Sequence, residues 1–171
     1  MNVVLTGFMA TGKSVVGKLV SQRLGYAFFD TDGMIEKQTG HTIADLFAKG
    51  GEAAFRELEA KTVALVALMD KAVIATGGGV PLRASNMDEL ERNGRIFCLT
   101  ASPETIVRRL GLEAGSRPLL AGANPMDRVR SLLADRERAY ARCHEKIETD
   151  ALTDQQVADR IAERVLKASP G

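Results

Sequence analysis

The sequence predicts an α/β protein of three layers, in which a mostly parallel sheet of about five strands lies between two layers of helices. Two observations lead to this fold class. Short segments rich in β-branched and aromatic residues alternate along the chain with longer stretches of helical period. The 171 residues, 45% of them hydrophobic, are enough for one well-buried core but not for two. We therefore expect a single domain over residues 1–171.

Four short segments have the composition of buried strands. They are Val3–Thr6, Ala27–Phe29, Ala72–Thr76 and Ile96–Thr100. Because strands and helices alternate, these strands are expected to run parallel and to be joined by helices that cover both faces of the sheet.

Three helices can be placed from the sequence. In a helix around Ala54–Met69 the apolar positions recur at three-and-four spacing, and this stripe should face the sheet. Its members are Phe55, Leu58, Thr62, Leu65, Val66 and Met69. A second helix follows Pro125. A third begins at a capping-box pattern, Thr153 with Gln156, and should run to about Lys167 before the chain frays.

The segment Gly111–Pro125 interrupts this pattern. It reads "GLEAGSRPLLAGANP", has no helical period and is longer than most connections inside a compact domain. Connections of this length are usually either functional or disordered. We therefore interpret residues 111–125 as a lid segment.

Composition and charge exclude several classes of protein. The chain has 23 basic and 22 acidic residues, a formal net charge of +1, so no overall basic field favours nucleic acid or an anionic membrane. The longest apolar run, Val63–Met69, cannot span a bilayer, and no secretory signal precedes the first strand. Cys98 lies in an apolar run and has no CxxC partner in Cys143, which favours reduced thiols over a disulfide. We expect a cytoplasmic monomer.

A glycine-rich loop follows the first predicted strand and precedes a further predicted helix, which begins close after it. "GFMATGKS", Gly7–Ser14, fits the motif G-x-x-x-x-G-K-[ST] in the context that the motif requires. Backbone N–H groups of such a loop surround phosphate oxygens, Lys13 reaches the β and γ phosphates, and the Ser14 hydroxyl can ligate Mg²⁺. The alternative is a glycine-rich turn with an incidental lysine. The complete motif favours nucleotide binding.

Two carboxylates follow the second predicted strand, in "FFDTD". Asp30 and Asp32 should lie at the sheet edge where open α/β sheets bind ligands. One could orient Mg²⁺ through its water shell while the other accepts a proton from an attacking hydroxyl. Alternatively, the pair is a turn signal and a helix N-cap. The pattern D-x-x-G also occurs in GTPase switches, but no N-K-x-D accompanies it here.

Arginine positions suggest an anionic substrate. At 100° per residue, Arg136 falls on the apolar face of its helix, within about 60° of Val129. Its neighbours on that face are Leu132, Leu133 and Tyr140. A guanidinium there needs an anionic or strongly polar partner. The alternatives are an internal ion pair, a side chain that snorkels to solvent, and a fork that receives a substrate carboxylate. Arg56 lies on the flank of its helix and by itself looks like a surface residue.

Two further features belong to the same sheet edge. "TGGGV", Thr76–Val80, ends the third predicted strand, and three consecutive glycines allow a ligand to approach the backbone closely. Arg117 lies in the lid segment, where it could neutralise charge on a transferring phosphoryl group. Its alternative is a solvated loop arginine.

Read together, these motifs resemble the shikimate kinase family. "GFMATGKS", "DTDGMIEKQTGHTIADLFAKGGEAAFRELE", "TGGG", "SRPLL" and "DRERAY" occur in the family's order and spacing. The resemblance implies a P-loop NTPase fold of the nucleoside monophosphate kinase type. It also implies that ATP, with Mg²⁺, phosphorylates the 3-hydroxyl of shikimate.

The resemblance assigns roles residue by residue. ATP would be bound by Ala10, Thr11, Gly12, Lys13, Ser14, Val15, Arg109 and Arg117, with Arg109 beside the adenine. Mg²⁺ would be held by Ser14 and, through water, by Asp30. Shikimate would be bound by Asp32, Arg56, Gly77, Gly78, Gly79 and Arg136, with Glu59 supporting Arg56. The catalytic residues would be Lys13, Asp32 and Arg117, and Asp32 is the candidate base.

Three positions depart from the family pattern. Ala10 stands where glycine is common, Val15 replaces a hydroxyl residue, and Asp154 replaces a proline near the adenine. Two alternatives stay open: a kinase for another small polyol acid such as gluconate or for a nucleoside monophosphate, and a nucleotide-binding module without catalysis. The presence of the full set Lys13, Asp32, Arg56, Arg117 and Arg136 disfavours the second.

Overall fold

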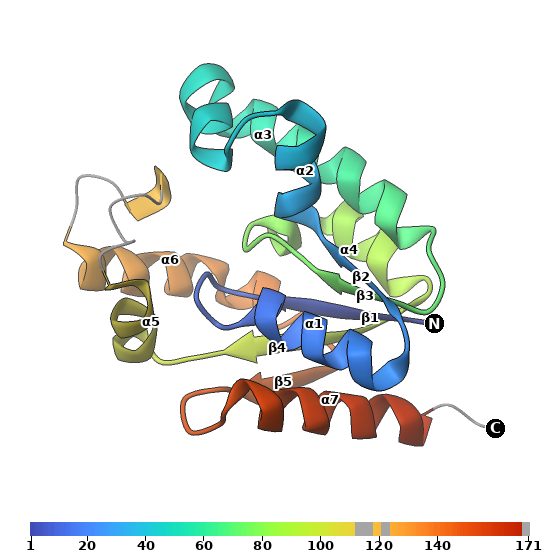
Figure 1. The fold of residues 1–171 in the computed structure, drawn as a ribbon. Coiled ribbons are helices and arrows are strands. Elements are labelled where there is room, and N and C mark those ends of the chain that lie inside the picture. Colours follow the sequence, from blue (N-terminus) through green and yellow to red (C-terminus); the bar gives the residue numbers. More distant parts are fainter. Residues whose placement is uncertain (112–117, 121–123, 169–171) are drawn as a thin grey trace.

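The computed structural model describes residues 1–111, 118–120 and 124–168, and a five-stranded parallel sheet forms its centre (Figure 1). The strands are β1 (Asn2–Gly7), β2 (Ala27–Asp30), β3 (Ala72–Ala75), β4 (Gly94–Thr100) and β5 (Glu145–Glu148). Their order is β2-β3-β1-β4-β5, and each neighbouring pair is parallel. The predicted fold class is confirmed.

The fifth strand was not located by the sequence pattern. β5 reads "EKIE", and in it Ile147 alone is fully buried. It is an edge strand that pairs only with β4. Because its other side chains face solvent in part, the segment lacks the apolar run that marks the central strands. The other four strands differ from their predicted bounds by at most two residues.

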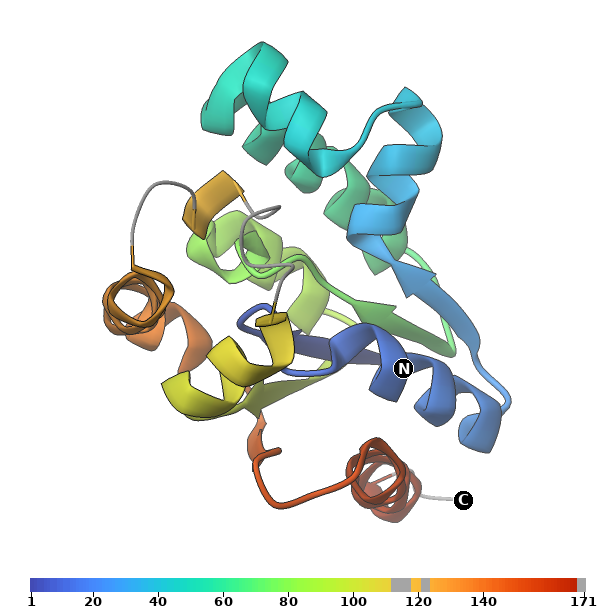
Figure 2. The same ribbon diagram turned by 60° about the vertical axis from the view of Figure 1, so that its left-hand side comes forward.

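Seven helices and two 3₁₀ turns are described. The helices are α1 (Lys13–Leu24), α2 (Thr31–Thr39), α3 (Ile43–Ala67), α4 (Ala84–Glu91), α5 (Pro103–Leu110), α6 (Pro125–Tyr140) and α7 (Asp154–Ala168). The 3₁₀ turns are η1 (Val80–Leu82) and η3 (Pro118–Leu120). Helices α1 and α7 lie on one side of the sheet and α3 and α4 on the other (Figure 2). Helices α5 and α6 pack on each other around Phe8 and Cys98.

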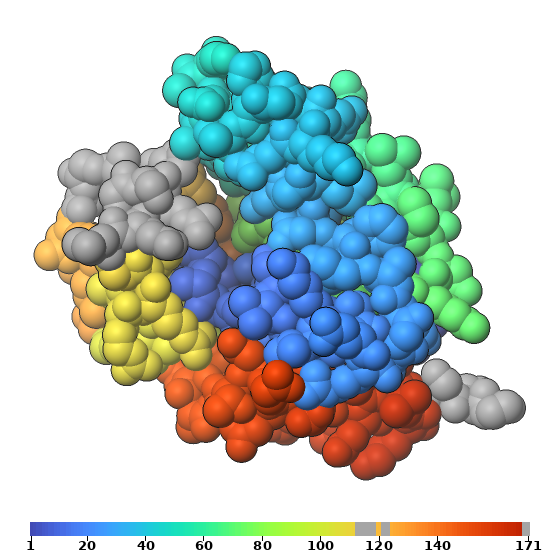
Figure 3. Space-filling view, viewed as in Figure 1, coloured from blue at the N-terminus to red at the C-terminus, as the bar shows by residue number. Residues whose placement is uncertain are grey.

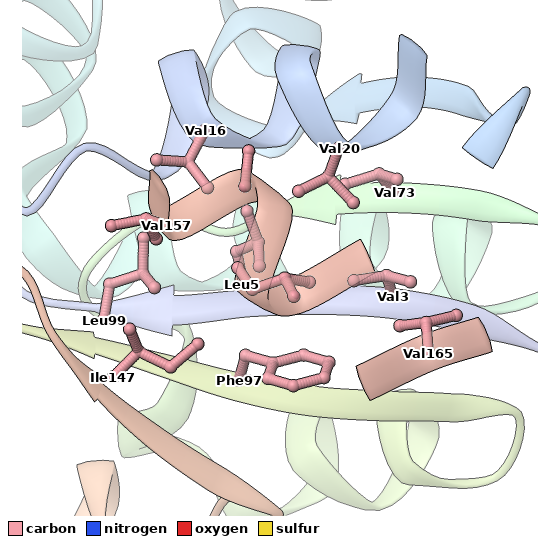
Figure 4. Close-up of a cluster of buried hydrophobic side chains, with 12 residues drawn as sticks. Val3, Leu5, Val16, Val20, Val73, Phe97, Leu99, Ile147, Val157 and Val165 are labelled. Atoms are coloured by element: carbon pink, nitrogen blue, oxygen red, sulfur yellow. The ribbon is translucent and has the colours of Figure 1, made fainter. Parts of the chain in front are cut away.

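Alternation along β1 connects the sheet to both helical layers. Val3 and Leu5 pack with Val16 and Val20 of α1 and with apolar residues of α7 (Figure 4), whereas Val4 packs on the opposite face. Successive side chains of a strand point to opposite faces, so one strand supports two cores. Both cores fix β1, and therefore the loop that follows it.

Helix α3 departs from its prediction. It begins at Ile43, with a capping box formed by Thr42 and Asp45, and its axis breaks at Gly51, where φ is 75° and ψ is 177°. The predicted stripe is partly wrong, because Leu65 and Met69 are 53% and 38% exposed. The buried positions are Phe55, Glu59, Thr62, Val63 and Val66. A buried glutamate belongs to this face, and hydrophobicity alone does not identify it.

The N-terminus of helix α7 has the structure that the sequence predicts. α7 carries the predicted capping box: the Gln156 N–H donates to Thr153 Oγ1 at 3.2 Å, and the Thr153 N–H donates to Gln156 Oε1 at 2.9 Å.

Of the lid segment, residues 112–117 and 121–123 lie outside the described residues, and η3 is a 3₁₀ turn within it. Cys98 and Cys143 are both free thiols, and Cys98 is buried as expected. No helix in the described ranges has the length and apolarity to cross a membrane.

Candidate active site

The glycine-rich loop leaves the central strand and turns into α1. Gly7, Ala10 and Gly12 have φ values of 133°, 60° and 96°, so three residues lie at positive φ. Ala10 therefore occupies a left-handed conformation that glycine would adopt without strain. The Lys13 amine donates to the carbonyls of Gly7 and Phe8 at 2.8 and 2.7 Å. The loop thus has the tight backbone turns that the motif predicts, and the Lys13 side chain extends back to the first residues of the loop.

Asp30 joins the glycine-rich loop to the start of α2. Its Oδ1 accepts the N–H groups of Asp32 and Gly33 at 3.1 and 3.2 Å, which makes it the N-cap of α2. Its Oδ2 accepts a hydrogen bond from the Ser14 hydroxyl. The N-cap interpretation of Asp30 is therefore confirmed, and its second oxygen contacts the Ser14 hydroxyl at the beginning of α1, whereas its role toward Mg²⁺ stays a prediction.

The glycine turn after β3 is held from two sides. The Gly77 N–H donates to Thr31 Oγ1 at 2.9 Å, and the Tyr140 hydroxyl donates to the Gly78 carbonyl at 2.7 Å. A Cβ on Gly77 would lie 2.6 Å from Asp32 Oδ1 and 2.8 Å from Glu59 Oε1. The absence of a side chain at Gly77 is therefore what allows these two carboxyl groups to approach the turn.

Arg56 is not the surface residue that its position on the helix suggested. Its side chain is 18% exposed, and its guanidinium donates to Glu59 at 2.5 Å and to Glu52 at 3.0 Å. The ring of Phe55 lies 5.5 Å from the guanidinium carbon. A Cβ on Gly79 would lie only 2.0 Å from Arg56 Nη1. Glu59 and Gly79 together define where this guanidinium sits.

Burial sets the ionisation of the Arg56–Glu59 pair. Removal from water raises the pKa of Glu59, and the positive charge of Arg56 offsets part of that rise. Burial acts to lower the pKa of Arg56, but the charges and hydrogen bonds of Glu59 and Glu52 outweigh it and raise that pKa. Arg56 is therefore a permanent cation at this site, as the predicted support by Glu59 requires.

Arg136 is buried, as its helical position predicted. It is 4% exposed, and its Nη1 lies 3.5 Å from both the Gly78 carbonyl oxygen and the Tyr140 hydroxyl. The Phe8 ring lies 5.8 Å from its guanidinium carbon. Arg136 forms no ion pair with an Asp or Glu within the described part of the chain. Among the described residues, the predicted internal ion pair is thus absent, and the buried side chain does not snorkel to solvent.

Arg109 joins α5 to two other segments. Its guanidinium donates to the Ala10 carbonyl at 3.1 Å, and to the hydroxyl and the carbonyl of Thr149 at 3.0 and 3.1 Å. A Cβ on Gly12 would lie 3.3 Å from Asp154 Oδ1, so the Asp154 carboxylate lies against the glycine-rich loop. Both residues therefore lie beside the glycine-rich loop, and their position relative to the adenine stays a prediction.

A cavity of about 370 Å³ joins these groups (Figure 3), where the surface is hollowed between the loop after β1 and the α2–α3 region. Twelve of the predicted site residues line it: Ala10, Gly12, Lys13, Ser14, Val15, Asp30, Asp32, Arg56, Gly77, Gly78, Gly79 and Arg136. Thr11 is buried beneath the loop, where its hydroxyl donates to the Phe8 carbonyl at 2.8 Å. Arg109 is not part of the lining, and Arg117 lies outside the described residues.

Sequence reasoning missed two residues that hold the site together. Thr31 is fully buried and anchors Gly77, and Tyr140 is 7% exposed and anchors Gly78. Thr31 is the middle residue of "FFDTD", in which the flanking acids drew attention. Tyr140 was counted with the apolar face of its helix. A buried hydroxyl needs a partner, and that requirement is the signal that could have identified both.

The chain is similar to known proteins over nearly its full length. The family model described as shikimate kinase matches residues 9–166. A shikimate kinase of Thermodesulfovibrio yellowstonii is 45% identical over 170 residues, covering 99% of this chain and 98% of that protein. One from Symbiobacterium thermophilum is 46% identical over 167 residues, with 96% of each chain covered.

Solved structures agree with this result. A shikimate kinase from Acinetobacter baumannii in complex with shikimate superposes with a TM-score of 0.93 and is 33% identical, and the match covers 99% of this chain and 95% of that one. The resemblance that the motifs indicated is thereby confirmed. The chain belongs to the shikimate kinase family.

Proposed function

We propose that this protein transfers the γ-phosphoryl group of ATP to the 3-hydroxyl of shikimate, giving shikimate 3-phosphate and ADP, a step of aromatic amino acid biosynthesis. One observation carries the proposal: a single cavity is lined by the phosphate loop with Lys13, by the carboxylate of Asp32 and by the buried guanidinium of Arg136. A phosphate donor and a substrate with a carboxylate and hydroxyls have complementary groups there.

The donor side is formed by the glycine-rich loop. Its N–H groups and the Lys13 amine would hold the phosphates, and the positive end of α1 adds to this field. The Ser14 hydroxyl and the Asp30 carboxylate are hard oxygen donors in contact with each other, which fits Mg²⁺ held partly through water. Bound there, Mg²⁺ would neutralise charge on the phosphates.

The acceptor side is formed by two arginines and one carboxylate. Arg136 and Arg56 would receive the substrate carboxylate, and Asp32 would bind its hydroxyls. The acceptor oxygen would form a bond to the γ-phosphorus while the bond from phosphorus to the bridging oxygen of ADP breaks. Asp32 is the candidate to take the hydroxyl proton. Arg117 would neutralise charge on the transferring group when the lid segment closes.

An acceptor panel tests the proposal most directly. With ATP and Mg²⁺, release of ADP is measured for shikimate, gluconate and a nucleoside monophosphate. Rapid turnover is expected with shikimate alone. Turnover of gluconate instead would favour the alternative kinase, and no turnover with any acceptor would favour a module without catalysis.

Variants separate the proposed roles. Asp32→Asn and Lys13→Met should abolish most turnover, whereas Arg136→Ala should raise the KM for shikimate far more than that for ATP. Arg92→Ala is the control, because that side chain is 71% exposed and lies outside the cavity. Normal kcat in Asp32→Asn would remove Asp32 as the base. Light scattering of the purified protein tests the expected monomer.

A further inference from the structure

The hydroxyl of Tyr140 connects the two halves of the acceptor side. Tyr140 is the last residue of α6, one turn after Arg136, and its ring packs in the core beside α5 and α6. Its hydroxyl donates to the Gly78 carbonyl at 2.7 Å and lies 3.5 Å from Arg136 Nη1. One phenol oxygen thus contacts both the buried arginine and the glycine turn.

This hydroxyl is the shortest link between α6 and the glycine turn. The direct contact from Arg136 to the Gly78 carbonyl is 3.5 Å long, near the limit of a hydrogen bond, whereas the Tyr140 bond has the length of a strong one. Burial raises the pKa of Tyr140 although the charge of Arg136 acts against it, so the phenol stays protonated and donates at neutral pH.

The same turn also abuts the second arginine. Gly78 is followed by Gly79, where an added Cβ would lie 2.0 Å from Arg56 Nη1. On the other side, Thr31 holds the Gly77 N–H at 2.9 Å. The turn is therefore attached to α2 through Thr31 and to α6 through Tyr140. Because Arg136 lies on α6 and Arg56 lies against the turn, the bond from Tyr140 connects the positions of the two arginines.

We propose that Tyr140 is a positioning residue for substrate binding: its hydroxyl fixes Arg136 and the Gly77–Gly79 turn relative to each other, and so holds the two arginines at the spacing that a substrate carboxylate needs. This inference rests on the proposed function, in which Arg136 and Arg56 receive that carboxylate. The ring serves the core, and only the hydroxyl serves the site. A carboxylate bound by two donors is sensitive to their spacing, because both must reach it at once.

Tyr140→Phe removes the hydroxyl and keeps the ring. The KM for shikimate should rise by about 10-fold, the effect expected for loss of one charge-assisted contact, while kcat and the KM for ATP change by less than about twofold. Tyr26→Phe is the matched control, because Tyr26 is the other of the two tyrosines and packs on the opposite face of the sheet. Circular dichroism shows whether each variant is folded, and Tyr140→Met replaces Tyr140→Phe if the latter is not.

Two further measurements exclude a merely structural role. In an Arg136→Ala background, adding Tyr140→Phe should leave the KM for shikimate unchanged, because the residue that it positions is gone. With the methyl ester of shikimate, which has no carboxylate charge, wild type and Tyr140→Phe should have equal KM values. A lowered Tm with equal losses for every substrate would overturn the inference.

The Arg136→Ala and Tyr140→Phe variants together distinguish an error in the role of Tyr140 from an error in the carboxylate site. If Arg136→Ala raises the KM for shikimate and Tyr140→Phe does not, only the positioning role is wrong. If Arg136→Ala leaves that KM unchanged, the assignment of the carboxylate site is wrong, and the role of Tyr140 is overturned with it.

Discussion

Replacement of Gly79 by alanine tests how tightly the acceptor site is built. The backbone at Gly79 has φ −92° and ψ −10°, which any residue adopts, so the substitution introduces no backbone strain. Its Cβ would, however, lie 2.0 Å from Nη1 and 2.3 Å from Cζ of Arg56. The methyl group and the guanidinium cannot occupy the same place, and the end of the flexible arginine side chain is the group that will move.

The size of the effect follows from the displacement. Ordinary contact begins at 3.4 Å, so Arg56 Nη1 must retreat by about 1.4 Å, the difference between 3.4 and 2.0 Å. A charge-assisted hydrogen bond to the substrate lost by that movement is worth about 1.5–3 kcal/mol. This corresponds to a fall of about 10- to 100-fold in kcat/KM for shikimate. Stability should fall, because the retreat of Nη1 weakens its hydrogen bond to the buried carboxylate of Glu59.

The assay is steady-state turnover with shikimate varied at saturating ATP, combined with thermal unfolding. Gly33→Ala is the matched control, since Gly33 lies outside the cavity lining and a Cβ there meets no atom closer than 3.8 Å. In an Arg56→Ala background, Gly79→Ala should add almost nothing, because the displaced group is absent. If kcat/KM for shikimate stays within twofold of wild type, or if Gly79→Ala causes equal losses in both backgrounds, a Cβ at this position does not act by displacing Arg56.

Three further outcomes follow from ionisation. The pKa of Glu59 is raised above its ordinary 4.5 in the folded protein. As pH rises through that raised value, the free energy of unfolding of the wild type, measured with urea, should therefore fall relative to that of Glu59→Gln. The KM of Glu59→Gln for shikimate should be higher than that of the wild type. A hydrogen bond from the Cys98 thiol lowers the pKa of Cys143 to about 7, so alkylation of Cys143 by iodoacetamide should have its midpoint near pH 7; a midpoint above pH 8 would contradict this. Hydrogen bonds from the start of α5 lower the pKa of Asp150 to about 2, so its stabilising contribution is present above about pH 4 and lost between about pH 4 and 2. Asp150→Asn should flatten that part of the acid-unfolding curve, and an unchanged curve would contradict the assignment.

Structural features that depend on residues close together in the sequence could be predicted from the sequence. The phosphate loop is a contiguous motif whose glycines and lysine define its own backbone, and the observed φ values at Gly7 and Gly12 agree with it. The capping box of α7 and the inward direction of Arg136 follow from spacing within one helix. In each case the residues that decide the structure are neighbours in the sequence.

Contacts between residues far apart in the sequence could be identified only in the three-dimensional structure. Arg56 looked like a surface residue until Gly79, 23 positions later in the chain, was placed beside it. Glu59 lies where the buried face of α3 lines the cavity, whereas Val63 and Val66 on the same face pack against the sheet.

The chain by itself therefore determined the parallel α/β fold, the phosphate loop and the family, because these depend on local pattern. The tertiary structure decided that Thr31 and Tyr140 hold the glycine turn at its two sides, because their partners are 46 and 62 residues away in the sequence. Helical or strand periodicity describes which face a side chain occupies, but it carries no information about which residue from another element that face will meet.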